Sequence, residues 1–141
     1  MPTNHGNKVY HQVALSPDED WVHNYRVPDV VLFRRAHRKY LQSAFCHGPC
    51  TVAVEIRSPN DETYEKLGFY AELEVPEVWV IDRDSKQLEI HVLDDGSYRE
   101  QSSDRYGWLR SEAVNVMMKH TKKSLTFQIV GDKASRRTLP E

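Results

Sequence analysis

At 141 residues, with 39% hydrophobic and 28% charged residues, the chain has the size and composition of one globular domain. It has no apolar run of the roughly 18 residues that a membrane span needs, and no apolar stretch near its start that would mark a signal peptide, so we expect a cytoplasmic protein without membrane contacts. The net charge of −2 argues against a protein that coats nucleic acid by bulk positive charge.

The polar, irregular start of the chain predicts an N-terminal arm over residues 1–24, loosely held. The folded domain is expected over residues 25–130 and a C-terminal tail over 131–141. Apolar runs rich in β-branched residues predict strands at 27–33, 51–56 and 77–82. Near-continuous runs of this kind are typical of strands covered on both faces.

Helical spacing of apolar residues predicts one helix from residue 62 to about residue 74. Asn60 or Asp61 is its expected N-cap, and Pro76 ends it. A strand at 88–93 follows a turn, and Asp94-Asp95-Gly96-Ser97 predicts a hairpin back to Tyr98. The region after Gly107 gives a clear strand signal only at 125–130. The order strand–strand–helix–strand–strand predicts an α/β domain with a mixed sheet.

Glu55 fits a purely structural interpretation least well, because it lies inside the apolar run Val-Ala-Val-Glu-Ile. An ionised carboxylate in such surroundings is unfavourable unless it is paired or holds a metal ion. Two structural alternatives stay open: a place at the solvated end of the strand, or an ion pair with Arg57 or Lys66.

Asp29 adds a second carboxylate at an apolar strand, directly after Pro28, although an Asp in that position is most often a turn or cap residue. Two carboxylates on neighbouring strands suit Mg²⁺, which takes oxygen ligands, and the backbone carbonyl of Ile56 is a candidate third ligand. Lys66, on the predicted helix, is placed to reach back to these acids, or else to pair with Glu62 four residues earlier.

Three stretches in order, YRVPDVV (25–31), VEIRSP (54–59) and KLGFYAELEVPEVWVID (66–82), resemble the Uma-type putative restriction endonucleases of the PD-(D/E)xK nuclease superfamily. The resemblance implies a restriction-endonuclease-like core, a mixed β-sheet flanked by helices. Members carry a longer region with an additional glutamate before the Pro-Asp motif, whereas 28 residues precede Asp29 here. The implied core is therefore N-terminally shortened.

The resemblance further implies a metal-dependent endonuclease in which Asp29, Glu55 and Lys66 are catalytic and Asp29, Glu55 and Ile56 bind Mg²⁺ or Mn²⁺. The superfamily lysine usually stands two residues after the acid, where this chain has Arg57, and Lys66 replaces it. We expect Arg57 to contact the phosphate of a DNA substrate, because a guanidinium binds phosphate through two parallel hydrogen bonds. The alternative function is an inactive nuclease-fold protein that binds nucleic acid or regulates.

Smaller features leave further alternatives open. Cys46 and Cys50 could begin a zinc-dependent interaction module, but no second cysteine pair exists, and a reduced turn before a strand is the alternative. The shortened core, together with the apolar strand near Trp79, favours a homodimer. Two basic clusters are candidate nucleic-acid contacts or ordinary solvated surface: Arg34, Arg35, Arg38 and Lys39, and Lys119, Lys122 and Lys123.

Overall fold

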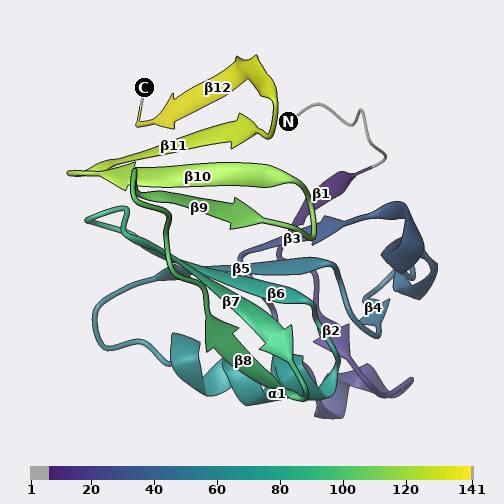
Figure 1. Ribbon diagram of the computed structural model, residues 1–141. Helices are drawn as coiled ribbons and strands as arrows, with labels where there is room; N and C mark the ends of the chain where they lie inside the picture. The colour runs from purple at the N-terminus through teal and green to yellow at the C-terminus, as the bar shows by residue number, and fades with distance from the viewer. Residues whose placement is uncertain (1–6, 141) are drawn as a thin grey trace.

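A central sheet of six strands, in the order β1-β3-β5-β6-β7-β8, runs through the computed structural model, which describes residues 7–140 (Figure 1). Its strands are β1 (Lys8–His11), β3 (Val30–Phe33), β5 (Val52–Arg57), β6 (Glu77–Asp82), β7 (Leu88–Asp94) and β8 (Ser97–Glu100). β5 and β6 are parallel and the other neighbours are antiparallel, so the sheet is mixed as the sequence predicts.

A second, antiparallel sheet covers one face of the first, with its strands in the order β12-β11-β10-β9 (Figure 1). It is formed by β9 (Trp108–Ser111), β10 (Val116–Thr121), β11 (Ser124–Ile129) and β12 (Asp132–Leu139). Of these strands the sequence predicts only β11. A short parallel pair, β2 (Leu15–Ser16) and β4 (Cys46–His47), completes the strands.

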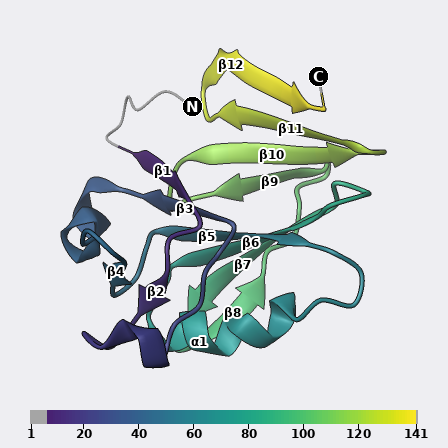
Figure 2. The same cartoon turned by 180° about the vertical axis from the view of Figure 1, so that it is seen from behind.

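Helical structure is sparse in residues 7–140, and the α-helix there flanks one face of the central sheet (Figure 2). The helical elements are the 3₁₀ turns η1 (Trp21–His23), η2 (Arg35–Tyr40) and η3 (Thr63–Lys66) and the α-helix α1 (Leu67–Glu72). The single helix predicted at 62–74 is therefore η3 continued by α1. It ends early because Glu74 takes a positive φ of 64° and Pro76 follows.

The two faces of the central sheet pack into two separate cores, which explains its near-continuous apolar strands. On β5, Val52 and Val54 face the second sheet, together with Trp79, Ile90 and Met118. The alternate residue Ala53 packs on the other face. There it joins residues of α1 and its C-terminal turn, among them Tyr70, Leu73 and Val75. Glu55 belongs to this second face because side chains alternate along a strand.

The two chain ends are more structured than expected. β1 lies within the predicted arm and pairs with β3, and β12 lies within the predicted tail and pairs with β11. Residues 1–6 of that arm and residue 141 of that tail lie outside the described residues. The expected domain boundaries, residues 25 and 130, stay a prediction.

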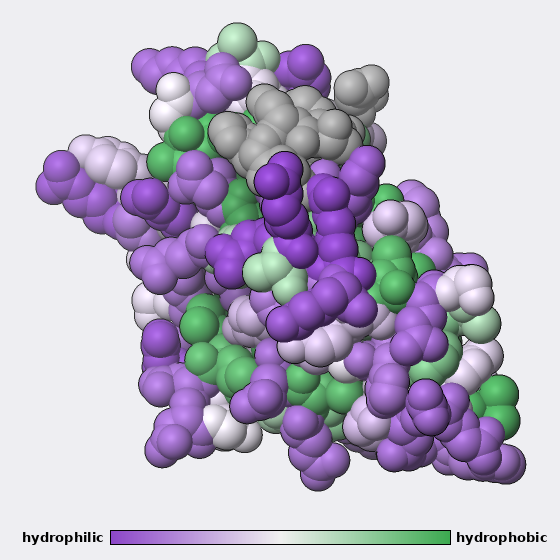
Figure 3. All heavy atoms as spheres, turned by 90° about the vertical axis from the view of Figure 1, so that its right-hand side faces the viewer, coloured by the Kyte–Doolittle hydropathy of each residue, from purple (hydrophilic) through white to green (hydrophobic). Residues whose placement is uncertain are grey.

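Three surface features bear on the sequence expectations. Trp79 is only 5% exposed beneath the second sheet, so the apolar strand that suggested a homodimer is buried within the chain. Within residues 7–140 no helix is both long and apolar enough to span a membrane. The end of the molecule that carries η2 and β4 is covered largely by hydrophilic side chains (Figure 3).

Candidate active site

Asp29 and Glu55 lie beside each other on one face of the central sheet. Val30 is paired with Val54 in the antiparallel ladder of β3 and β5. One step further along this register, Asp29 stands opposite Glu55, and directly opposed residues point to the same face. The Asp29 Oδ2 atom accepts the backbone N–H of Ile56 at 2.7 Å, which ties the loop before β3 to the end of β5.

Glu55 is buried, with only 3% of its surface exposed. Lys66 Nζ donates to its Oε1 atom at 3.1 Å, and the Tyr70 hydroxyl donates to its Oε2 atom at 2.6 Å. Burial raises the pKa of the Glu55 carboxyl above its ordinary value, although the bonds from Tyr70 and Lys66 oppose that rise; the nearby charge of Asp29 adds to it. Of the alternatives weighed from sequence, the solvated position is wrong and the ion pair with Lys66 is present.

The segment from η3 to α1 delivers Lys66 and Tyr70 to this carboxylate. The two residues are four positions apart and therefore lie on one side of the helical segment. Asp61 fixes its start, as its carboxylate accepts the backbone N–H of Ser58 at 2.7 Å and that of Thr63 at 3.0 Å. These backbone donors lower the pKa of Asp61, the Ser58 bond most.

Arg57 lies two residues beyond Glu55 on the same face of β5. Its guanidinium is 3.6 Å from Asp82 on β6 and lies over the ring of Tyr64, 5.3 Å from the centroid. Asp82 accepts the backbone N–H groups of Ser85 and Asp84, which lower its pKa. A partly exposed guanidinium thus stands next to the Glu55–Lys66 pair at the end of the strand.

The chain is similar to known proteins in both sequence and fold. The sequence profile of Uma2, described as "Putative restriction endonuclease", matches residues 3–116. The chain belongs to the Uma2 family. The crystal structure of a putative nuclease belonging to DUF820 from Anabaena variabilis superimposes with a TM-score of 0.57 and 12% sequence identity, over 85% of this chain and 67% of that one. No curated protein matches the sequence. The fold is thus restriction-endonuclease-like.

The donor set in this Uma2 core suits a hard divalent cation. Asp29 and Glu55 each offer carboxylate oxygens, and an oxygen that already accepts one hydrogen bond keeps a second lone pair. The backbone N–H of Ile56 donates to Asp29. The Ile56 side chain lies on the opposite face of β5 from Glu55, and the residue is 38% exposed. A ligand role for the Ile56 carbonyl stays a prediction.

A second group that could hold a metal ion lies on the same face of the sheet, further along it. Glu89 and His91 on β7 and Glu100 on β8 bring one ligand atom each to within 4.8 Å of one another. Glu89 Oε1 is 2.9 Å from His91 Nε2, and both oxygens of Glu89 accept the Tyr64 hydroxyl at 3.0 and 2.9 Å. The ladder pairs Val80 with both Glu55 and Glu89, so one strand separates the two groups.

No role for this second group was predicted from sequence. The signal that could have revealed it is the alternation of β7, where Leu88 and Ile90 face the second sheet while Glu89 and His91 face the other way. Tyr70 is a fully buried core tyrosine, and it also flanks the site through its bond to Glu55.

The cysteine turn and the basic cluster of η2 lie away from these residues. Cys46 and Cys50 are buried thiols, and within residues 7–140 no group of three or more candidate metal ligands includes them. Burial raises the pKa of Cys46 to about 12. Asp29 directly precedes the first residue of β3, whereas η2 follows the last. The basic cluster of η2 therefore lies at the opposite end of this strand from the candidate site.

Proposed function

We propose that this Uma2 protein is a metal-dependent endonuclease that hydrolyses phosphodiester bonds of DNA, with its active site at Asp29, Glu55 and Lys66. The observation that carries the proposal is the contact of a buried carboxylate with an ammonium group, beside a second carboxylate that directly precedes the neighbouring strand. Structural ion pairs also perturb carboxyl groups, but here a second acid shares the same face and the chain belongs to a family of putative restriction endonucleases.

In this proposal Asp29 and Glu55 hold Mg²⁺ or Mn²⁺, with the Ile56 carbonyl as a third oxygen. The cation supplies Lewis acidity, which stabilises negative charge on phosphate oxygens and lowers the pKa of a water. Asp29 keeps its position through the Ile56 N–H. The Tyr70 hydroxyl holds the Glu55 carboxylate in one rotamer, so the two acids are fixed before the substrate arrives.

Lys66 and Arg57 supply positive charge on the substrate side. Lys66 is 29% exposed at its side chain, so its ammonium can turn from Glu55 to orient the attacking water or a phosphate oxygen. Arg57 would bind the phosphate through its guanidinium. The Arg57 side chain is 34% exposed, which leaves the outer nitrogens of its guanidinium accessible to such a contact.

The direct test compares the wild-type protein with an Asp29→Ala/Glu55→Ala variant on supercoiled plasmid DNA with Mg²⁺ or Mn²⁺. We expect cleavage by the wild type and none by the variant. Glu72→Gln is the matched control, since it removes one exposed acid of α1. Equal cleavage by wild type and double variant would assign the activity to a contaminant, and none by either would overturn the proposed catalysis.

The second candidate is a nuclease-fold protein that binds nucleic acid without cutting it. It is favoured by one observation, that both oxygens of Glu55 are already engaged by Lys66 and Tyr70. Thermal unfolding with and without Mn²⁺ separates the two, because a cation that binds only the folded state raises its apparent stability. Stabilisation lost in Glu55→Gln supports the nuclease, whereas stabilisation lost only in His91→Ala places the cation at the second group.

The proposal keeps DNA as the partner and a cytoplasmic location. A homodimer stays part of it, although the strand that first suggested one is covered by the chain itself. Sedimentation of the purified protein would settle the number of subunits.

A further inference from the structure

Three cations, Arg110, Lys119 and Arg136, lie on the outer face of the β9–β12 sheet. Along β10, Val116 and Met118 face the core, so Met117 and Lys119 face outward. The ladder extends this outward face to neighbouring strands, where Lys119 is paired with Trp108 and Thr126, and Met117 with Arg110 and Gln128. Arg136 on β12 joins it through its bond to Gln128, 2.8 Å from Nε to Oε1.

Trp108 lies at the centre of this positive charge. Lys119 Nζ is 5.9 Å from the centre of its ring system, and the Arg136 guanidinium carbon is 5.4 Å from it. The ring is partly exposed, although it stands on a strand whose next residue, Leu109, is buried. A planar ring between cations on an open sheet has the two elements that single-stranded nucleic acid needs, a stacking surface for bases and charge for phosphates.

Charge is divided unevenly between the two parts of the chain. Residues 108–139 hold seven Lys or Arg against two Asp or Glu, whereas the rest of the sequence holds 12 against 19. The overall charge of −2 is therefore the sum of a positively charged segment, residues 108–139, and a negatively charged remainder. Such a local patch, rather than net charge, is what attracts a polyanion.

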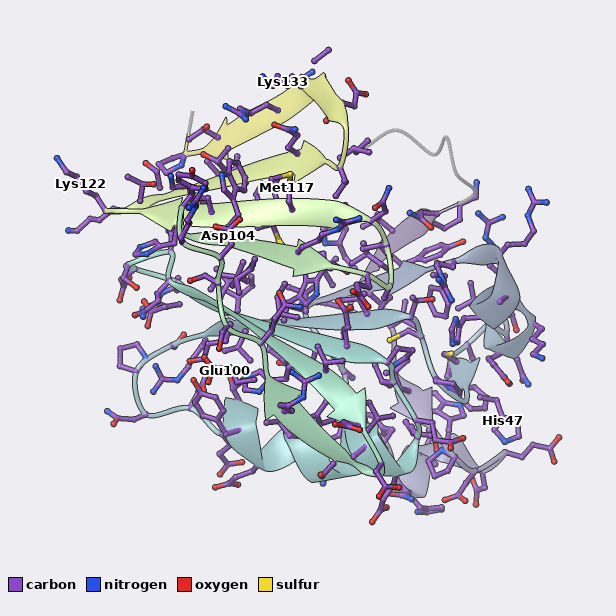
Figure 4. The ribbon with its side chains drawn as sticks, in the orientation of Figure 1. His47, Glu100, Asp104, Met117, Lys122 and Lys133 are labelled. Carbon is purple, nitrogen blue, oxygen red and sulfur yellow. The ribbon has the colours of Figure 1, made fainter. Side chains whose placement is uncertain are left out.

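The outer face leads toward the candidate active site. Lys122 and Lys123 form the turn between β10 and β11, and Lys122 projects from its tip (Figure 4). His120, just before this turn, contacts the backbone carbonyl of Ser85 in the β6–β7 turn at 2.9 Å. Figures 1 and 2 both place the hairpin tip on the same side of the molecule as the loop between β5 and η3. Cations thus continue from the sheet to the β10–β11 turn, and this hairpin contacts the β6–β7 turn, which is hydrogen-bonded to Arg57 at the end of β5.

We infer that the outer face of the β9–β12 sheet, centred on Trp108, Lys119 and Arg136, binds single-stranded DNA and leads it over the β10–β11 turn toward the active site. The choice of DNA rests on the proposed function. The choice of a single strand rests on the surface itself, since paired bases cannot stack on Trp108 and a flexible strand can follow the sheet around its edge to the far layer.

The test measures binding of a fluorescein-labelled dT oligonucleotide in EDTA, so that no cleavage is required. Lys119→Glu/Arg136→Glu is expected to weaken binding at least tenfold and to flatten its salt dependence, since each lost phosphate contact on a single strand removes about 0.7 from the logarithmic slope. Trp108→Phe keeps a stacking ring and should keep most of the binding, while removing the quenching of tryptophan fluorescence by the oligonucleotide.

Lys39→Glu is the matched control, because Lys39 also lies over an aromatic ring, that of Tyr40 at 5.2 Å, but at the η2 end of the molecule. Thermal unfolding of each variant checks that it is folded. Unchanged binding by a folded Lys119→Glu/Arg136→Glu variant, an equal loss in Lys39→Glu, or stronger binding of duplex than of single strand would each overturn the inference. If the Lys119→Glu/Arg136→Glu variant loses oligonucleotide binding and the wild type never cleaves DNA, the inference is sustained while the nuclease proposal is refuted.

Discussion

Glu55 is held in a position that opposes its own ionisation, which couples the site to the stability of the domain. Its pKa is raised by burial, so the folded state holds the proton more tightly than the unfolded chain does. The protonated Glu55 carboxyl contributes its full stabilisation at pH values below its pKa in the unfolded chain. This stabilisation is lost as the pH rises through its higher pKa in the folded protein.

Glu55→Gln is therefore expected to abolish cleavage yet to raise the free energy of unfolding at neutral pH. Gln can still accept the Tyr70 hydroxyl, and Lys66, being partly exposed, can return to water. Urea unfolding from pH about 4 to about 8, a range that starts near the ordinary carboxyl pKa, is the measurement. The wild type should lose stability relative to the variant as the pH rises, and parallel curves would contradict the assignment.

The residues of the proposed site could be selected from sequence, but the contacts between them could not. An acid inside an apolar run is visible in the sequence, and so are the Pro-Asp pair and the helix lysine. The bond from Tyr70 to Glu55 depends on where α1 crosses the sheet, which no local pattern encodes. The group of Glu89, His91 and Glu100 depends in the same way on strand register.

At the scale of elements, the turn before η3 sets the position of Lys66. Asp61→Ala removes the two backbone bonds of that turn. The expected loss of stability is about 1 kcal/mol, as for a removed helix cap. The cleavage rate is expected to fall by more than the loss of folded protein would explain, because η3 carries Lys66 and its start is no longer held by Asp61.

Asp61→Asn is the comparison variant, since its amide oxygen can still accept one of the two backbone bonds. Cleavage rates at saturating DNA, with urea unfolding alongside, separate the two effects. Asp61→Ala cleavage equal to wild type would show that η3 is positioned by its packing alone.

Gly48 is a second element-scale constraint, in the turn between the two cysteines. Its φ of +133° is a conformation that side chains rarely adopt, and a Cβ there would lie 2.8 Å from Tyr40 Cδ1. Gly48→Ala is expected to destabilise the fold by roughly 1–3 kcal/mol through backbone strain. Urea unfolding of the wild type and the variant, each with and without EDTA, tests this. If the variant is less stable than the wild type only when EDTA has removed zinc, the zinc module would be supported instead.

Strands β3, β5, β6 and β7 of the central sheet were predictable because their apolar runs end at clear turns, whereas β1 was missed because it is mostly exposed. The Asp95-Gly96 turn also matches its sequence, since both residues take positive φ, 51° and 86°. β12 was missed for a physical reason: nearly all its residues are exposed, so no apolar alternation marks it. The predicted helix was overextended because a regular apolar spacing does not distinguish a 3₁₀ turn from an α-helix.

At the scale of the whole molecule, the second sheet shares a core with the strands that carry the candidate site. The core between the sheets joins Met118 of β10 to Val54 of β5 and Trp79 of β6. Val54 directly precedes Glu55, so loosening this core reaches the strand that holds the site. The nuclease-like layer is thus stabilised by strands that carry none of the proposed catalytic residues.

Met118→Ala tests this dependence, because Met118 is fully buried at 0% exposure. Truncation of a buried methionine is expected to cost about 2–5 kcal/mol. Because one core serves both sheets, urea unfolding should remain a single transition at a lower midpoint with an unchanged slope. Fluorescence of the tryptophans and circular dichroism of the backbone should then report the same midpoint. Two separated transitions would instead show that β9–β12 unfolds alone, and in that case Mn²⁺ stabilisation of the remaining sheet would survive the substitution.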